Sequence, residues 1–141
     1  MLGSSGWGLV GRDNEVDAIT AALGDDDVRG LVLVGPRGVG KTRLAAECLQ
    51  AGEGAGYATV RVSATRSAAD LPLGAFAPIL PERGGTGVAL LAGARKALAE
   101  RRGDDKLLLF VDDAHLLDDV SATLLRHLAD DPQMFVLVTI R

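Results

Sequence analysis

Two stretches of this chain combine residue types that could do chemistry. One is GPRGVGKT at residues 35–42, which brings glycines, an ammonium and a hydroxyl together. The other is the pair Asp112 and Asp113, which follows the apolar run KLLLFV. Backbone N–H groups and an ammonium suit phosphate oxygens, and carboxylates suit a divalent cation. The sequence therefore predicts a site for a phosphorylated ligand with its metal ion.

Four positions of the first stretch, Gly35, Gly40, Lys41 and Thr42, fit the pattern G-x-x-x-x-G-K-[ST] in full. Glycines let the backbone N–H groups face an anion, and a helix that begins near Lys41 points its positive end at the same place. The Lys41 ammonium is expected to reach the β- and γ-phosphates and to act in catalysis, and the Thr42 hydroxyl to ligate Mg²⁺. The alternative is a glycine-rich turn with an exposed lysine. The residues of this stretch that are expected to contact the nucleotide are Gly35, Pro36, Arg37, Gly38, Val39, Gly40, Lys41, Thr42 and Arg43.

Asp112 and Asp113 are expected to supply the acidic half of the site. A carboxylate at the carboxyl end of a buried strand, beside a phosphate loop, can hold the water shell of Mg²⁺, and Asp112 is assigned that role. Asp113 is expected to orient or deprotonate an attacking water. The alternative is a solvated strand end without function. His115 could contact the same site, although a polar loop residue is the simpler interpretation.

Apolar patterns along the chain predict the elements that must position these residues. Apolar runs typical of strands occupy residues 31–34, 57–63, 106–113 and 134–140. Apolar residues at helical spacing occupy residues 15–23, 41–50, 87–102 and 119–130. Strands that alternate with helices imply right-handed crossovers. We therefore expect an α/β fold of three layers, with a mainly parallel sheet of about four strands between two layers of helices.

Several local features of these elements are also predicted. Asp118 or Asp119 is expected to cap the last helix, and Val88 is expected to face inward from the helix before it. Cys48 is interpreted as a buried structural thiol rather than a reactive one. Residues 66–87 contain three of the five prolines, so they are expected to form a loop with one short helix.

The composition argues against several classes of function. The 141 residues suit one domain, the net charge is −4, and no block of lysine and arginine would follow a nucleic acid backbone. No apolar run reaches the roughly 18 residues that span a membrane, and the first residues do not resemble a signal peptide. A single cysteine suits a reducing compartment. We expect a cytoplasmic protein that binds neither nucleic acid nor membranes through this chain.

With these elements placed, the chain resembles a known family. The resemblance rests on LVGRDNEVDAI at residues 9–19, on the glycine-rich stretch after LVLV, on VDDAHLLDD at residues 111–119 and on FVLVTIR at residues 135–141. This combination is similar to the AAA+-type ATPase module of STAND signalling ATPases, a class of P-loop NTPases. Within that class it is most similar to the large ATP-binding transcriptional regulators of the LuxR type.

The resemblance implies a nucleotide, ATP or ADP, together with Mg²⁺. Val10, Gly11 and Arg12 match the segment that lies against the adenine base in such modules, and Thr139 and Arg141 match the polar residues that sense the γ-phosphate. The alternatives are a turn before a helix for the first group and an exposed chain end for the second.

The resemblance also suggests how the chain is divided. Residues 1–8 are interpreted as a flexible arm and residues 9–141 as the ATPase core. Family members continue with a fifth strand, a helical lid and a C-terminal helix-turn-helix, so we expect a truncated module whose DNA-binding part is missing. Without a fifth strand, residues 31–34 would form a bare apolar sheet edge, and self-association through this edge or through the exposed lid-side surface is expected.

Three functions remain open at this point. The first is an ATP-binding switch module of a transcriptional regulator, with weak or no hydrolysis. The second is an active AAA+-type ATPase, although many ATPases of this architecture have glutamate where Asp113 stands, and the shorter side chain favours slow turnover. The third is a small-molecule kinase of the P-loop class, which the proline-rich residues 66–87 argue against.

Overall fold

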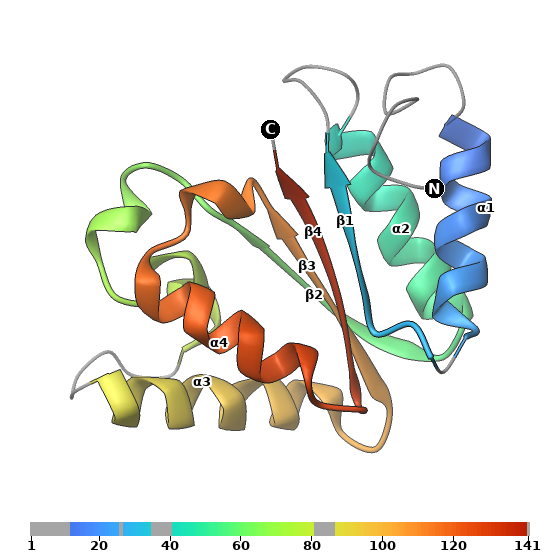
Figure 1. Ribbon diagram of the computed structural model, residues 1–141. Helices are drawn as coiled ribbons and strands as arrows, with labels where there is room; N and C mark the ends of the chain where they lie inside the picture. The colour runs from blue at the N-terminus through green and yellow to red at the C-terminus, as the bar shows by residue number, and fades with distance from the viewer. Residues whose placement is uncertain (1–11, 26, 35–40, 81–86, 141) are drawn as a thin grey trace.

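The computed structural model describes residues 12–25, 27–34, 41–80 and 87–140. These residues form a four-stranded parallel sheet with helices packed on both faces (Figure 1). The prediction of a three-layer α/β fold with a parallel sheet is thereby confirmed.

All four strands lie where the apolar runs predict them. They are β1 (Gly30–Val34), β2 (Tyr57–Ser63), β3 (Lys106–Asp112) and β4 (Met134–Ile140). Every pairing is parallel, and the order across the sheet is β1-β4-β3-β2. The five central residues of β3, 107–111, are completely buried because β3 lies inside the sheet with helices over both faces.

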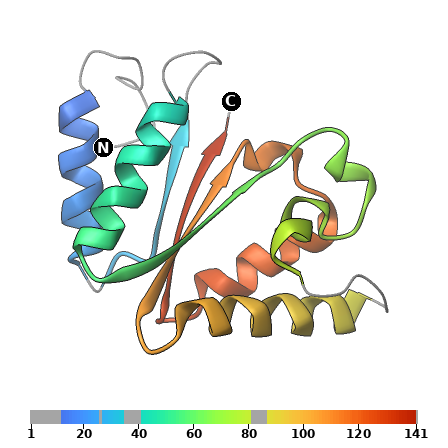
Figure 2. The same ribbon diagram turned by 180° about the vertical axis from the view of Figure 1, so that it is seen from behind.

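The helices fall into two layers, one on each face of the sheet. The α-helices are α1 (Arg12–Leu23), α2 (Lys41–Gly54), α3 (Gly87–Arg102) and α4 (Asp119–Ala129). α1 and α2 cover one face, and α3 and α4 cover the other (Figures 1 and 2). The crossover through α2 runs across the sheet from β1 to β2, whereas those through α3 and α4 run back. Right-handed crossovers in opposite directions place their helices on opposite faces.

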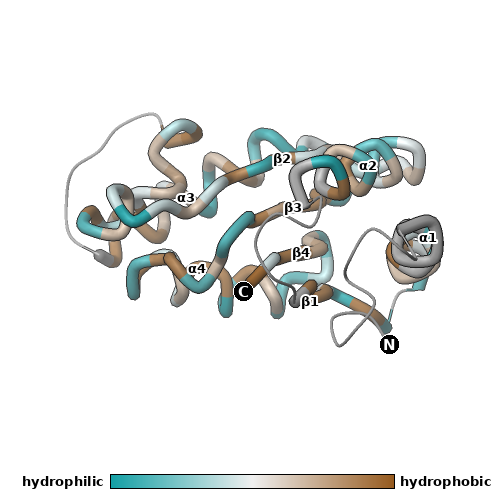
Figure 3. The backbone as a smooth tube through the Cα atoms, turned by 90° about the horizontal axis from the view of Figure 1, so that it is seen from above, coloured by the Kyte–Doolittle hydropathy of each residue, from teal (hydrophilic) through white to brown (hydrophobic). Residues whose placement is uncertain are grey.

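The layer of α1 and α2 is held by a compact apolar cluster. Ile19 of α1 and Leu44 and Cys48 of α2 pack against the sheet residues Phe110 and Leu137, and all five are buried. The view from above shows these helices on one side of the apolar strands (Figure 3). Cys48 is fully buried, which confirms its interpretation as a structural thiol.

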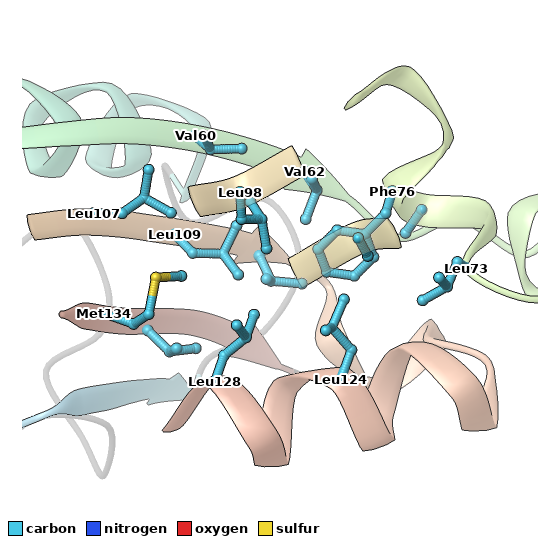
Figure 4. Packing of buried hydrophobic residues seen from close by; sticks show 14 of the residues in the cluster. Val60, Val62, Leu73, Phe76, Leu98, Leu107, Leu109, Leu124, Leu128 and Met134 are labelled. Carbon is cyan, nitrogen blue, oxygen red and sulfur yellow. The ribbon is translucent and has the colours of Figure 1, made fainter. Parts of the chain in front are cut away.

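The opposite layer contains a larger cluster, to which the proline-rich segment contributes. Leu98 of α3 and Leu124 and Leu128 of α4 face the sheet, and Leu73 and Phe76 close the cluster from the side (Figure 4). Phe76 belongs to η2 (Gly74–Ile79), a 3₁₀-helix that follows the short η1 (Ala68–Asp70). In the described part of the predicted loop, residues 66–80, there are two 3₁₀-helices instead of one, and residues 73–76 are buried in the core. Residues 81–86 of that loop lie outside the described residues.

Some element boundaries differ from the prediction. α1 begins at Arg12, three residues earlier than expected. α2 continues four residues further, to Gly54, because Gly52 lies buried against β3 instead of ending the helix. Val88 does not face inward: it is 79% exposed, since the buried stripe of α3 begins one turn later.

β1 forms one edge of the sheet as far as the structure describes it. Its only partner within those residues is β4, and Val32 in its middle is 49% exposed. The expected apolar edge at residues 31–34 is present.

Candidate functional site

The glycine-rich stretch connects β1 to α2. β1 ends at Val34 and α2 begins at Lys41, so a strand precedes the stretch and a helix follows it, as a phosphate loop requires. Gly35, Pro36, Arg37, Gly38, Val39 and Gly40 lie outside the described residues. Lys41 and Thr42 open the helix, as expected, and the contacts predicted for their side chains remain predictions.

The first carboxylate, Asp112, lies at the carboxyl end of β3, on the side of the sheet that α2 covers. Phe110 and Leu137 are register partners in the cluster under α2, and side chains alternate between faces along a strand. Two residues further along each strand, Asp112 and Thr139 therefore share that face. α2 runs antiparallel to the strands, so its N-terminus lies at the same edge of the sheet (Figure 1).

Thr139 joins the two predicted carboxylate residues through one hydroxyl. Its Oγ1 donates a hydrogen bond to Oδ1 of Asp112 at 2.5 Å and accepts one from the backbone N–H of Asp113 at 2.9 Å. Thr139 is completely buried, and its hydroxyl forms a part-buried hydrogen bond with each partner. The alternative of an exposed chain end is wrong for Thr139, because β4 holds it between β1 and β3.

The second oxygen of Asp112 faces a cation that the sequence analysis missed. Nη2 of Arg61, on β2, lies 3.9 Å from Oδ2 of Asp112. The only feature of the sequence that could have indicated Arg61 is the alternation of residues along β2. Arg61 alternates with buried Val60 and Val62, so it had to lie on the face opposite to theirs, but which face carries the site depends on the sheet order.

Asp113 turns the chain out of β3. Its backbone has φ 55° and ψ 49°, the left-handed conformation that asparagine and aspartate tolerate better than most residues. It precedes η3 (Ala114–Leu116), and its N–H is held by Thr139. Backbone outliers of this kind often mark functional sites, and this one lies where a catalytic carboxylate is predicted.

The remaining predicted site residues lie nearby or outside the described chain. Arg43 is exposed, and its Nε lies 3.9 Å from Oε1 of Glu47, one turn further along α2. The contact predicted between Arg43 and the nucleotide remains a prediction. Arg12 is the first residue of α1. Val10, Gly11 and Arg141 lie outside the described residues. His115 is exposed, as the simpler interpretation expects.

The donor set of this edge suits magnesium. Mg²⁺ prefers one or two carboxylates completed by waters and by phosphate oxygens, and Asp112 together with the predicted hydroxyl of Thr42 supplies protein oxygens of that kind. Within the described part of the chain, no three metal-ligating side chains come together. None of the helices described is both long and apolar enough to cross a bilayer.

The order of the strands brings the carboxyl ends of β1, β4 and β3 side by side. β1 leads into α2 on one face, and β3 leads towards α4 on the other, with β4 between them. In open α/β sheets, ligands bind outside the carboxyl ends of the strands where the chain diverges in this way. Asp112 and Thr139 belong to that edge, and β1 ends there at Val34.

Comparison with known proteins agrees with this geometry. Residues 8–87 match the family model described as AAA ATPase domain. A search of curated proteins found no match. A solved structure described as "Structure of C. elegans PCH-2" superposes with a TM-score of 0.56, over 92% of this chain and 37% of that one, at 17% identity. At that identity the likeness concerns the fold, and the chain spans well under half the length of that structure. The matched residues cover more than half of the 141, so the chain belongs to the AAA ATPase domain family.

Proposed function

We propose that this chain is an ATP-binding switch module, which holds ATP or ADP with Mg²⁺ between residues 35–42 and the ends of β3 and β4. The observation that carries the proposal is the hydroxyl of Thr139, which bonds both Asp112 and Asp113 at the edge where α2 begins. A hydrogen-bonded bridge from the buried Thr139 to two adjacent, partly buried carboxylate residues would fix the acidic half of the site before any ligand arrives.

Each residue has a defined part in binding. The backbone N–H groups of the glycine-rich stretch and the Lys41 ammonium would hold the phosphates, and Thr42 and Asp112 would hold the cation. When bound, Mg²⁺ neutralises charge on the β- and γ-phosphates. Thr139 keeps Asp112 oriented towards that position and connects it to β4.

The arrangement favours a switch over rapid turnover. Asp113, the residue proposed to orient the attacking water, carries the short side chain, and its backbone is held by Thr139. A change at the γ-phosphate could therefore reach β4 and the turn after β3 through one hydroxyl. An active ATPase is the alternative, and a small-molecule kinase is the weaker one. Affiliation with LuxR-type regulators, cytoplasmic location and the division into an arm at residues 1–8 and a core at residues 9–141 are part of the same proposal.

A competition experiment tests the ligand class. A fluorescent ATP analogue is bound to the protein, and ATP, ADP and GTP are added as competitors in the presence of Mg²⁺. We expect ATP and ADP to displace the analogue and GTP to do so more weakly. Failure of ATP and ADP to compete, with the protein folded by circular dichroism, would contradict the proposal.

A further inference from the structure

We infer that Arg61 is a positioning residue that replaces the metal ion while none is bound. Its guanidinium offsets the negative charge of Asp112, so that a nucleotide can bind before Mg²⁺ does. The inference rests on the proposed function, because it concerns the same site. Arg61 lies on β2, the strand farthest from the glycine-rich stretch, and no part of the predicted site includes it.

The position of Arg61 follows from the strand register. Arg61 pairs with Phe110 in the parallel ladder, so it lies on the same face as Asp112, two residues before the strand end. Its Nη2 atom is 3.9 Å from Oδ2 of Asp112. Its Cζ atom lies 6.0 Å from the centre of the Phe110 ring, within the range of a cation–π contact.

Both oxygens of Asp112 therefore have partners before a ligand binds. Thr139 donates to Oδ1, and the Arg61 guanidinium faces Oδ2. The side chain of Asp112 is only 16% exposed and that of Arg61 is 34% exposed, so the carboxylate is the better shielded of the two. Asp112 therefore has one partner at each oxygen, and the side chain of Arg61 is the more exposed of the ion pair.

The charges of the carboxylates and the phosphates explain why a cation is needed at Asp112. Asp112 and the adjacent Asp113 would repel the phosphates of a metal-free nucleotide, and a cation 3.9 Å from Asp112 reduces that repulsion. Arginine keeps its charge at every physiological pH. Bound Mg²⁺ would offset the charge of Asp112 in place of Arg61, whose contact with the Phe110 ring does not depend on the metal.

The test compares nucleotide affinity with and without the metal. ATP is titrated into the wild type, Arg61→Gln and Arg61→Lys, once in Mg²⁺ and once in EDTA. We expect Arg61→Gln to weaken the binding of ATP in EDTA by a factor roughly threefold larger than in Mg²⁺. This factor is the one expected for the loss of a partly exposed ion pair. Arg61→Lys should restore most of the loss, because it keeps the charge. Arg66→Gln, which removes an exposed arginine just after β2, is the matched control and should change neither affinity.

A double-mutant cycle identifies the partner. In an Asp112→Asn background, Arg61→Gln should no longer affect the ratio of the two affinities, because the charge that it balances is gone. A role in folding alone would lower the melting temperature but leave that ratio unchanged. If Arg61→Gln unfolds, Arg61→Met serves the same test, since it keeps an apolar contact with Phe110.

The outcomes separate the two proposals. Wild-type protein that binds ATP, with an affinity ratio that Arg61→Gln leaves unchanged, overturns the role of Arg61 and leaves the proposed function standing. Wild-type protein that binds ATP in neither condition overturns both. A ratio that shifts equally in both Asp112 backgrounds also overturns the inference, because Arg61 would then act on the nucleotide directly.

Discussion

Thr139 is the residue on which the candidate site depends most directly. Its single hydroxyl serves as donor to Asp112 and acceptor for the backbone N–H of Asp113. We expect Thr139→Val, which keeps the shape, to lower the free energy of unfolding by about 1–3 kcal/mol, because the partly buried N–H of Asp113 loses its acceptor and Oδ1 of Asp112 loses its donor. Thr139→Ser keeps the hydroxyl and is the control. Urea denaturation measures both, and equal stability of wild type and Thr139→Val would contradict this account.

The sequence predicted the residues that belong to a linear pattern and missed one that does not. Asp112 was recognisable because a carboxylate ended a buried strand, and Thr139 lies beside it. The γ-phosphate contact that the family resemblance implied for Thr139 stays a prediction. Arg61 was missed because its neighbour depends on which strands pair, and 51 positions separate it from Asp112. Local patterns do not determine contacts across a sheet.

Asp118 connects two elements at the scale of the fold. It caps α4 by accepting hydrogen bonds from the N–H and hydroxyl of Ser121, and it also accepts one from the N–H of Leu73 in the proline-rich segment. Burial raises the pKa of its carboxyl, but these hydrogen bonds together outweigh burial, so its pKa lies below the ordinary value of 3.8. The prediction that Asp118 or Asp119 caps the helix is confirmed with Asp118 as the cap.

This depressed pKa makes part of the stability depend on pH. The carboxylate binds protons more weakly in the folded state, so its contribution is complete above the unfolded value and is lost as the pH falls through the folded one. We expect Asp118→Ala to lower the free energy of unfolding by about 1 kcal/mol at pH 7, and the difference from wild type to shrink below about pH 4. Denaturation series at several pH values measure this. Asp119→Ala is the control, and a difference that grows towards acid pH would contradict the assignment.

The elements themselves were predictable to different degrees. β1, β3 and β4 carried runs of four or more apolar residues, β2 carried apolar residues in alternation, and all four strands formed where expected. The segment at residues 66–80 has no such period, so its packing could not be predicted. Its turns depend on Leu73, which adopts a left-handed backbone with φ 56°, and on Gly74, where a Cβ atom would lie only 2.0 Å from the Ala68 carbonyl oxygen. Such features become visible only in three dimensions.

At the scale of the whole molecule, the exposed edge of β1 predicts association. An apolar edge strand presents unpaired N–H and C=O groups to other chains, and a lysine in such a strand is a common way of preventing that. We expect the average mass from light scattering to rise with concentration for the wild type and to stay at the monomer value for Val32→Lys. Val88→Lys replaces another exposed valine, on α3, and should still associate. A wild-type mass that does not change with concentration would contradict the proposal.

The central claim, that residues 35–42 bind a nucleotide, is tested most directly by calorimetry. ATP and ADP are titrated with Mg²⁺ into the wild type, into Lys41→Ala and into Lys96→Ala, which removes an exposed lysine of α3 as a control. We predict that wild type and control bind alike and that Lys41→Ala binds at least about tenfold more weakly, a loss of about 1.4 kcal/mol. Equal affinity of Lys41→Ala and wild type, or no binding by a folded wild type, would contradict the claim.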